Sequence, residues 1–265
     1  MYSFIIFFSF LIQIFACTQA DKKQVIDPVV KKQVHHLGST PITIKTTTYG
    51  TPSNFVFIQL HDNEETAQKA ALKLLEEKNG IIISIENKGR RTISFSLKGK
   101  KYVFDPNRMF TEKGIRESLQ RLGTYTPGAA VEVRRFATAF LKSIPQNAVI
   151  VAVHNNTDKN YSILSYYTDP QSKQSAKAVY RNKNKDADDF FITTNEALFT
   201  SLKKENFNVV LQNNARAFDD GSLSVYMGKR NRIYVNVEAE HGHMTEQSIM
   251  LEKLLQQVKH LDESF

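Results

Sequence analysis

Short apolar runs alternate with amphipathic segments along most of this chain, and this alternation constrains its fold more than any other feature. Runs rich in β-branched residues at 55–60, 81–85 and 148–153 predict buried strands. Apolar residues at helical spacing over 67–75 predict a helix that stops at Asn79-Gly80. Strands that alternate with helices are typical of α/β domains. We therefore expect one α/β domain with a mixed, mostly parallel central sheet flanked by helices.

The remaining expected elements follow from the same criteria. We expect further strands at 40–49, 161–167, 208–212 and 232–239, and a hairpin formed by 91–97 and 101–104. We expect further helices at 111–122, 129–144, 196–204 and 246–261. The segment 169–189 is rich in Lys, Asn, Asp and Ser, which predicts a long loop. Such a loop could cover a binding site or be a plain insertion.

The N-terminus carries an uncharged apolar run over residues 2–16. A spanning helix needs roughly 20 apolar residues, so this shorter run is more typical of the apolar part of an export signal. It ends in Ile14-Phe15-Ala16-Cys17, which resembles the lipobox of bacterial lipoproteins. We expect a lipoprotein-type signal peptide at 1–16, a lipidated Cys17, a polar linker over 17–38 and the folded domain over 39–265. A plain signal peptide with an incidental Cys is the alternative, because basic residues are missing before the apolar run.

Charge and cysteine content exclude several classes of function. The chain has 35 Lys and Arg against 27 Asp and Glu, and the formal net charge of +8 lies entirely beyond residue 16. These basic residues are scattered among acidic ones, and the sequence has neither a basic helix nor a zinc-finger or RRM signature, so we expect no nucleic-acid partner. The single Cys excludes an internal disulfide and a cysteine-based zinc site. Any metal must therefore be held by His and carboxylate side chains.

Two histidines and one glutamate follow the ends of predicted strands. His61 and Glu64 follow the strand at 55–60, and His154 follows the strand at 148–153. Ligands bind at the carboxyl ends of strands in open α/β sheets. Two His and one Glu form a known ligand set of catalytic zinc, with the fourth position left to water. Each residue alone is more typical of an ordinary structural position, but together they predict a site for one Zn²⁺ ion.

His241 and His243 form a rival metal pair, although Gly242 between them favours a turn.

Two further groups could act on a substrate. Asn107 and Arg108 offer an amide and a planar guanidinium, which suit a substrate carboxylate or a carbonyl; a turn with a solvated Arg is the alternative. Glu238 and Glu240 share one face of the last predicted strand. A carboxylate at such a strand end can serve as general base for a metal-bound water. The alternating pattern does not choose between these two glutamates.

The order H-x-x-E, N-R, H, E resembles the zinc carboxypeptidase superfamily, and locally the branch of aspartoacylase and succinylglutamate desuccinylase. The resemblance spans about 61–242, and residues 101–110 (KYVFDPNRMF) are similar to that branch's R-Y-x-x-x-D-L-N-R-x-F pattern. It implies a zinc-carboxypeptidase-like fold. It also implies roles for individual residues: zinc ligands His61, Glu64 and His154, substrate or oxyanion contacts Asn107 and Arg108, and a general acid/base Glu238. Glu240 fits the desuccinylase ending E-x-G and stays the alternative base.

The sequence also departs from the pattern of that branch. Asp62 stands where the branch has Gly, and Pro106 where it has Leu. Lys101 or its neighbour Lys100 stands where the branch has an Arg that helps to bind a carboxylate; a Lys keeps the charge but loses the planar fork. Tyr226 is the available candidate for the tyrosine of the carboxypeptidase site. Arg90 and Arg91 stand at about the spacing of a further carboxypeptidase arginine.

The resemblance implies a zinc-dependent hydrolase that cleaves an amide bond of a peptide with a metal-activated water, and the N-terminal apolar run implies that this hydrolase is exported. Deacylation of an N-acyl amino acid is the alternative reaction. A lipid-anchored protein that binds a peptide or glycan without cleaving it is the alternative outside enzymes. We expect a monomer in the bacterial periplasm or cell envelope, attached to the membrane through a lipid on Cys17.

Overall fold

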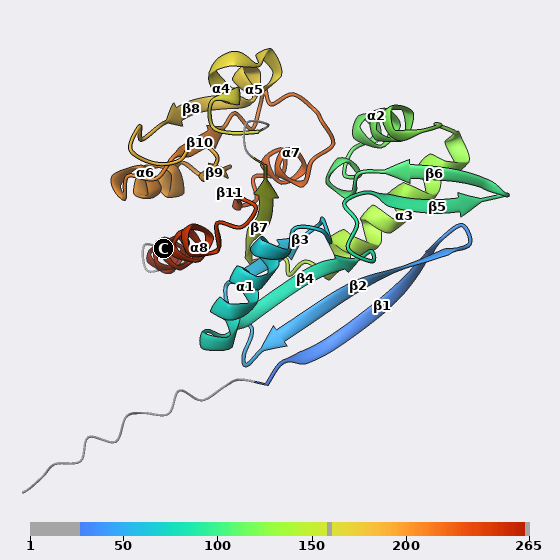
Figure 1. Ribbon diagram of the computed structural model, residues 1–265, viewed down its shortest axis with the longest axis horizontal. Coiled ribbons are helices and arrows are strands. Elements are labelled where there is room, and N and C mark those ends of the chain that lie inside the picture. Colours follow the sequence, from blue (N-terminus) through green and yellow to red (C-terminus); the bar gives the residue numbers. More distant parts are fainter. Residues whose placement is uncertain (1–26, 158–160, 263–265) are drawn as a thin grey trace, which may run out of the picture.

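The chain folds around one nine-stranded mixed sheet (Figure 1). The computed structural model describes residues 27–157 and 161–262. In sheet order, the strands are β1 (Val29–Leu37), β2 (Thr40–Tyr49), β4 (Gly80–Glu86), β3 (Phe55–Gln59), β7 (Val149–Asn156), β11 (Tyr234–Glu240), β9 (Phe190–Thr193), β10 (Val209–Gln212) and β8 (Ala176–Tyr180). The four strands β4, β3, β7 and β11 run parallel to one another. Antiparallel pairs flank this parallel centre.

Helices cover both faces of the sheet, which explains the apolar strands at its centre. One face packs against α1 (Glu65–Glu77), α6 (Glu196–Lys204) and α8 (Met244–Asp262). The other packs against α2 (Glu112–Leu122), α3 (Pro127–Ser143), α7 (Leu223–Gly228) and the hairpin of β5 (Ile93–Leu97) and β6 (Lys100–Phe104). Successive side chains of β3 alternate between these two cores. Both faces of β7 are covered, so all its residues are buried.

This architecture confirms the predicted fold class. The structure is a single α/β domain whose mixed sheet has a parallel centre and lies between two layers of helices. The predicted hairpin and the predicted helices at 111–122, 129–144 and 196–204 are present to within a few residues. The apolar runs at 55–60, 81–85 and 148–153 are the central strands β3, β4 and β7.

A polar linker was expected over 17–38. Residues 17–26 lie outside the described part of the chain, and most of the described residues of this segment form a strand rather than a linker. Residues 29–37 form β1, which pairs with β2 in an unbroken antiparallel register from Val29 to Leu37. Because β1 lies at an edge of the sheet, most of its side chains are exposed. An exposed edge strand carries many polar residues. Strands were predicted from apolar runs, so β1 was not predicted.

The prediction of a strand at 161–167 is wrong. Local hydrogen bonds of Ser162 and Ser165 form turns there, followed by the short helix α4 (Ser165–Thr168). The prediction of a continuous loop at 169–189 is also wrong, since it contains α5 (Pro170–Ser175) and β8. The side chain of Asp169 accepts from the amide of Ser172 and caps α5, with Pro170 at its first position.

The proposed signal peptide at 1–16 and Cys17 lie outside the described residues. In the described part of the chain, no helix combines the length and apolar character required to cross a membrane.

Two glycines allow the loop before α7 to lie directly against α2. A Cβ atom on Gly114 of α2 would lie 2.3 Å from the Cα atom of Gly221 and 2.6 Å from the carbonyl oxygen of Arg108. Gly221 has a φ of +79°, and its carbonyl oxygen accepts from the amide of Phe110. The contact fixes the loop before α7 relative to the segment that carries Arg108.

We expect Gly114→Ala to lower the free energy of unfolding by about 1–3 kcal/mol, because an added methyl group meets backbone on two sides. Gly123→Ala is the matched control: it changes the residue at the end of the same helix, where a Cβ would meet no atom within 4 Å. Urea unfolding followed by circular dichroism measures both. Equal stabilities of the two variants would show that the backbone contact is not tight.

Candidate metal centre

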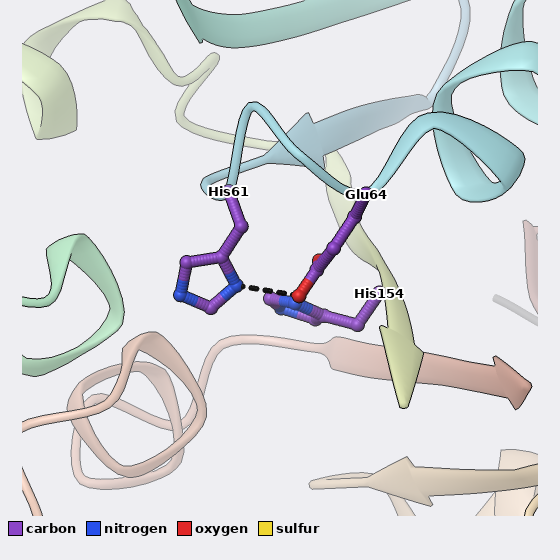
Figure 2. Close-up of side chains that lie close together, drawn as sticks. All are labelled: His61, Glu64 and His154. Atoms are coloured by element: carbon purple, nitrogen blue, oxygen red, sulfur yellow. Dashed lines mark hydrogen bonds and ion pairs between the residues drawn. The ribbon is translucent and has the colours of Figure 1, made fainter. Parts of the chain in front are cut away.

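His61, Glu64 and His154 meet at the carboxyl ends of the central strands (Figure 2). His61 follows β3, Glu64 precedes the first turn of α1, and His154 lies on β7. Their exposed fractions are 1%, 2% and 3%. The Nδ1 atoms of His61 and His154 lie 2.8 Å and 2.9 Å from the two carboxylate oxygens of Glu64. The structure thus brings together the three residues predicted as metal ligands, with ligand atoms within 4.8 Å of one another.

Asp105 and Arg91 hold this group from the side of the β5–β6 hairpin. The Nε2 atom of His61 lies 2.8 Å from Oδ1 of Asp105. Arg91 donates from Nη1 to Oε1 of Glu64 at 2.7 Å, and its Nε lies 3.8 Å from Oδ2 of Asp105. The carboxylate of Asp105 also accepts a hydrogen bond from the backbone amide of Asn107 and so caps the short 3₁₀ helix η1 (Pro106–Arg108). A carboxylate on the second nitrogen of a metal-binding histidine fixes the direction of its ring.

The charges of the group stabilise one another. Burial alone would raise the pKa of Glu64, but His61 and His154 beside it hold that pKa well below its usual range. Burial alone would lower the pKa of His61, but Glu64 and Asp105 raise it to about 9. An isolated carboxylate would be costly at this depth, so Glu64 needs a cationic partner.

The donor set fits a divalent metal ion. Because one ring nitrogen of His61 faces Asp105 and the other faces Glu64, the ring must either carry both protons or offer Nδ1 to a cation. Nε2 of His154 is buried and has no hydrogen-bond partner among the described residues. Two imidazoles and one carboxylate in a buried group are a known ligand set for such ions.

Glu238 lies beside this group. It sits on β11 directly opposite His154 on β7, and its side chain is buried with 7% exposed. Burial raises the pKa of Glu238, His154 opposes this shift, and Glu64 adds to it. The amide of Asn236 donates to Oε1 of Glu238 at 2.9 Å and holds the carboxylate in place.

A cavity of about 1050 Å³ opens over the group. Its wall includes the predicted site residues His61, Glu64, Asn107, Arg108, His154 and Glu238. It does not include Glu240, which is half-buried and lies 3.3 Å from His243, between Oε2 and Nε2. The geometry therefore favours Glu238 over Glu240 as the residue next to the candidate metal.

Lys101 and Tyr226, predicted as substrate contacts, do not line the cavity, so the structure does not bring them together with the candidate metal ligands. Alternation along β6 turns Tyr102 and Phe104 into the core and leaves Lys101 exposed. Tyr226 lies on α7, where its ring packs near Phe110 and the guanidinium carbon of Arg230 lies 3.5 Å from the ring centre.

Other cavity residues were missed at the level of sequence. Asp220 lies 3.5 Å from Nη1 of Arg108. The hydroxyl groups of Tyr161 and Tyr166 lie 2.7 Å apart. Both tyrosines line the cavity, and so does Tyr234. Burial raises the pKa of all three tyrosines. Alternating polarity indicates that a tyrosine is buried but not which cavity it reaches, so the sequence held no direct signal for these residues.

Asp62, which departs from the pattern of the branch that this chain resembles, has a local structural role. Asp62 accepts hydrogen bonds from the backbone amides of Asn87 and Gly89 at 2.7 Å and 2.8 Å, which ties the turn before β5 to the segment after β3.

Of the two adjacent arginines, Arg91 reaches the cavity wall, whereas Arg90 does not. His241 and His243 do not form a shared metal site among the described residues; Gly242 between them has a φ of +97° and lies in a turn, as expected.

Comparisons with known proteins give matches only among solved structures. Neither a protein-family model nor a curated protein matches the sequence. An aspartoacylase family protein from Mesorhizobium loti is 12% identical, over 90% of this chain and 69% of that one, with a TM-score of 0.43. A succinylglutamate desuccinylase/aspartoacylase from Rhodobacter sphaeroides is 11% identical, over 91% and 67%, with a TM-score of 0.43. A candidate metallopeptidase from Shewanella amazonensis is 11% identical, over 86% and 85%, with a TM-score of 0.38.

The first two structures carry the names of the branch that the motifs of this chain resemble.

Asp105→Asn should weaken metal binding about 10- to 100-fold, because His61 loses the carboxylate that orients its ring. Asp169→Asn is the matched control, since it changes a carboxylate that caps α5 and leaves an amide able to cap the same helix. Competition with a metal indicator dye measures both affinities. Unchanged affinity of the Asp105→Asn protein would show that Asp105 does not support a metal ligand.

Proposed function

We propose that this protein is a zinc-dependent hydrolase that cleaves an amide bond of a peptide. One observation carries the proposal: a buried group of two histidines and one glutamate shares a cavity with a buried carboxylate, Glu238, and with Arg108. Two histidines and a glutamate form the ligand set of several catalytic zinc sites. Structural zinc sites, by contrast, are closed by a fourth protein ligand.

His61, Glu64 and His154 are the residues that would hold the ion. When bound, zinc would lower the pKa of a water molecule towards roughly 7 and polarise a carbonyl group. Asp105 keeps the ring of His61 turned towards Glu64 for this purpose. Arg91 neutralises part of the negative charge of the carboxylate pair and closes one side of the group.

Glu238 would move the protons of the reaction. Its buried carboxylate has a raised pKa, which makes it a better proton acceptor than an exposed glutamate. It takes a proton from the attacking water and then donates it to the leaving nitrogen. The hydrogen bond from Asn236 keeps the carboxylate in one orientation during both transfers.

Arg108 and Asn107 would bind the substrate. Arg108 lines the cavity and can stabilise the oxyanion that forms on the attacked carbonyl. The side-chain oxygen of Asn107 accepts the backbone amide of Leu223 at 3.0 Å, which fixes η1 against α7. With Lys101 outside the cavity, the groups of the wall that could recognise a substrate carboxylate are the guanidinium groups of Arg91, Arg108 and Arg121.

The size of the cavity favours a peptide over an N-acyl amino acid. At about 1050 Å³ it lies just above the range of ordinary ligand pockets, which span roughly 300–1,000 Å³. Polar side chains from α2, α5 and the segment before α7 extend its wall well beyond the candidate metal ligands.

We also propose that the protein is exported and anchored to a bacterial membrane as a monomer. The apolar run at 2–16 supports export, and the lipobox-like Ile14-Phe15-Ala16-Cys17 supports the lipid anchor. Scattered basic residues without a nucleic-acid-binding motif support a function that does not involve nucleic acid.

The purified protein should cleave peptides, and a chelator should abolish the cleavage. Mass spectrometry of a mixed library of peptides and N-acyl amino acids, with and without chelator, measures this together with zinc content. Cleavage of N-acyl amino acids alone would replace the peptidase by a deacylase. A protein that binds zinc and cleaves neither class would be a binding protein.

Glu238→Gln should lower turnover about 100- to 10,000-fold while zinc content stays unchanged, because the general base is lost and the ligands are kept. Glu65→Gln is the matched control, since Glu65 is an exposed residue whose carboxylate pairs with Lys69. Rates at saturating substrate and elemental analysis of each variant provide the measurement. Full activity of the Glu238→Gln protein, together with inactivity of Glu240→Gln, would reassign the base to Glu240.

A further inference from the structure

A second group of potential metal ligands lies outside the cavity wall. Asp186 in the loop after β8, Glu240 at the end of β11 and His243 before α8 place ligand atoms within 4.8 Å of one another. All three side chains are exposed or half-buried. Glu240 and His243 stand three residues apart in the sequence, whereas Asp186 comes from a distant segment, so the fold brings Asp186 to a local pair.

The ring of His243 lies between two carboxylates. Its Nδ1 atom lies 3.4 Å from Oδ1 of Asp189, and its Nε2 atom lies 3.3 Å from Oε2 of Glu240. His61 has the same surroundings, with Asp105 at one ring nitrogen and Glu64 at the other. In metal sites, such an aspartate orients the histidine and leaves the opposite nitrogen for the ion.

The group lacks sufficient positive charge of its own. Three carboxylates, of Asp186, Asp189 and Glu240, surround one imidazole, and among the described residues none of them forms an ion pair with Lys or Arg. Asp189 is only 9% exposed. A divalent cation would compensate these charges.

We propose that Asp186, Glu240 and His243 bind one divalent cation of the zinc type, at a site separate from the central group. An imidazole with two carboxylates suits zinc and similar transition metals, whereas calcium and magnesium prefer oxygen ligands alone. Partial exposure leaves room for water to complete the coordination. Asp189 is a positioning residue that holds the ring of His243.

Such an ion would fasten one wall of the cavity. The carbonyl oxygen of Asp188 accepts from the side chain of Asn156 at 2.6 Å, and that of Ala187 accepts from the amide of Ile163 at 3.0 Å. Asn156 itself lines the cavity. By joining Asp186 to the end of β11, the ion would restrain residues 186–189 and the wall that rests on them.

Equilibrium dialysis of the chelator-treated full chain against Zn²⁺ tests the site. We expect the unaltered protein to bind two equivalents and His243→Ala to bind one. His241→Ala is the matched control and should keep both, because it removes a neighbouring exposed imidazole outside the group. Asp189→Asn should keep both equivalents but weaken one of them about 10- to 100-fold.

Three results would overturn the proposal: equal zinc binding by the unaltered and His243→Ala proteins, a single equivalent that disappears in a His61→Ala/His154→Ala protein, or binding of Ca²⁺ but not Zn²⁺. Asp186→Asn provides a second test, since this exposed loop residue can change without loss of the core and should also remove one equivalent. Circular dichroism confirms that each variant is folded. Lack of hydrolysis would refute the proposed function alone, because zinc bound through His243 is measured without substrate.

Discussion

The site and much of the surrounding structure depend on the contacts of the buried carboxylate of Glu64. This carboxylate contacts His61 after the end of β3, His154 on β7 and Arg91 in the segment before β5. A carboxylate that is almost completely buried is tolerated only with such partners. Loss of Glu64 would leave Asp105 as the carboxylate in contact with His61 and Arg91, and would take from His154 the carboxylate at its Nδ1 atom. The same contacts therefore stabilise the fold and hold the candidate metal ligands in place.

The parallel centre of the sheet explains why these groups meet. Because β3, β7 and β11 are parallel neighbours, residues that follow or end them emerge at the same edge. This made a large part of the site predictable. Central strands must be apolar on both faces, so they are visible in the sequence, and a His or Glu at the end of such a run is conspicuous. The positions of His61 and His154 followed from this rule, whereas the rule left both Glu238 and Glu240 open as the neighbouring carboxylate.

The rest of the site depends on relations that a single sequence does not display. Whether Lys101 points into the core or into solvent depends on the pairing of β5 with β6. The direction of the Tyr226 side chain depends on the helix formed by residues 223–228. The cavity is also reached by Asp220, Tyr161 and Tyr166. They lie in segments whose conformation is set by local hydrogen bonds in turns and helix caps. The short elements α4, α5 and β8 have few apolar residues, so the criterion that found the central strands could not find them.

The polarity of β1 has a consequence beyond its concealment in the sequence. An edge strand exposes a row of backbone donors and acceptors that can recruit the edge of another molecule. In β1 the exposed residues Val29, Val30 and Val34 are interrupted by Lys31 and Lys32. Adding a second strand there would bring the ammonium group of Lys31 close to a neighbouring backbone and strip it of water, whereas the ammonium group of Lys32 pairs with Glu86 of β4. A charged lysine on a free edge thus disfavours the edge-to-edge pairing of two molecules.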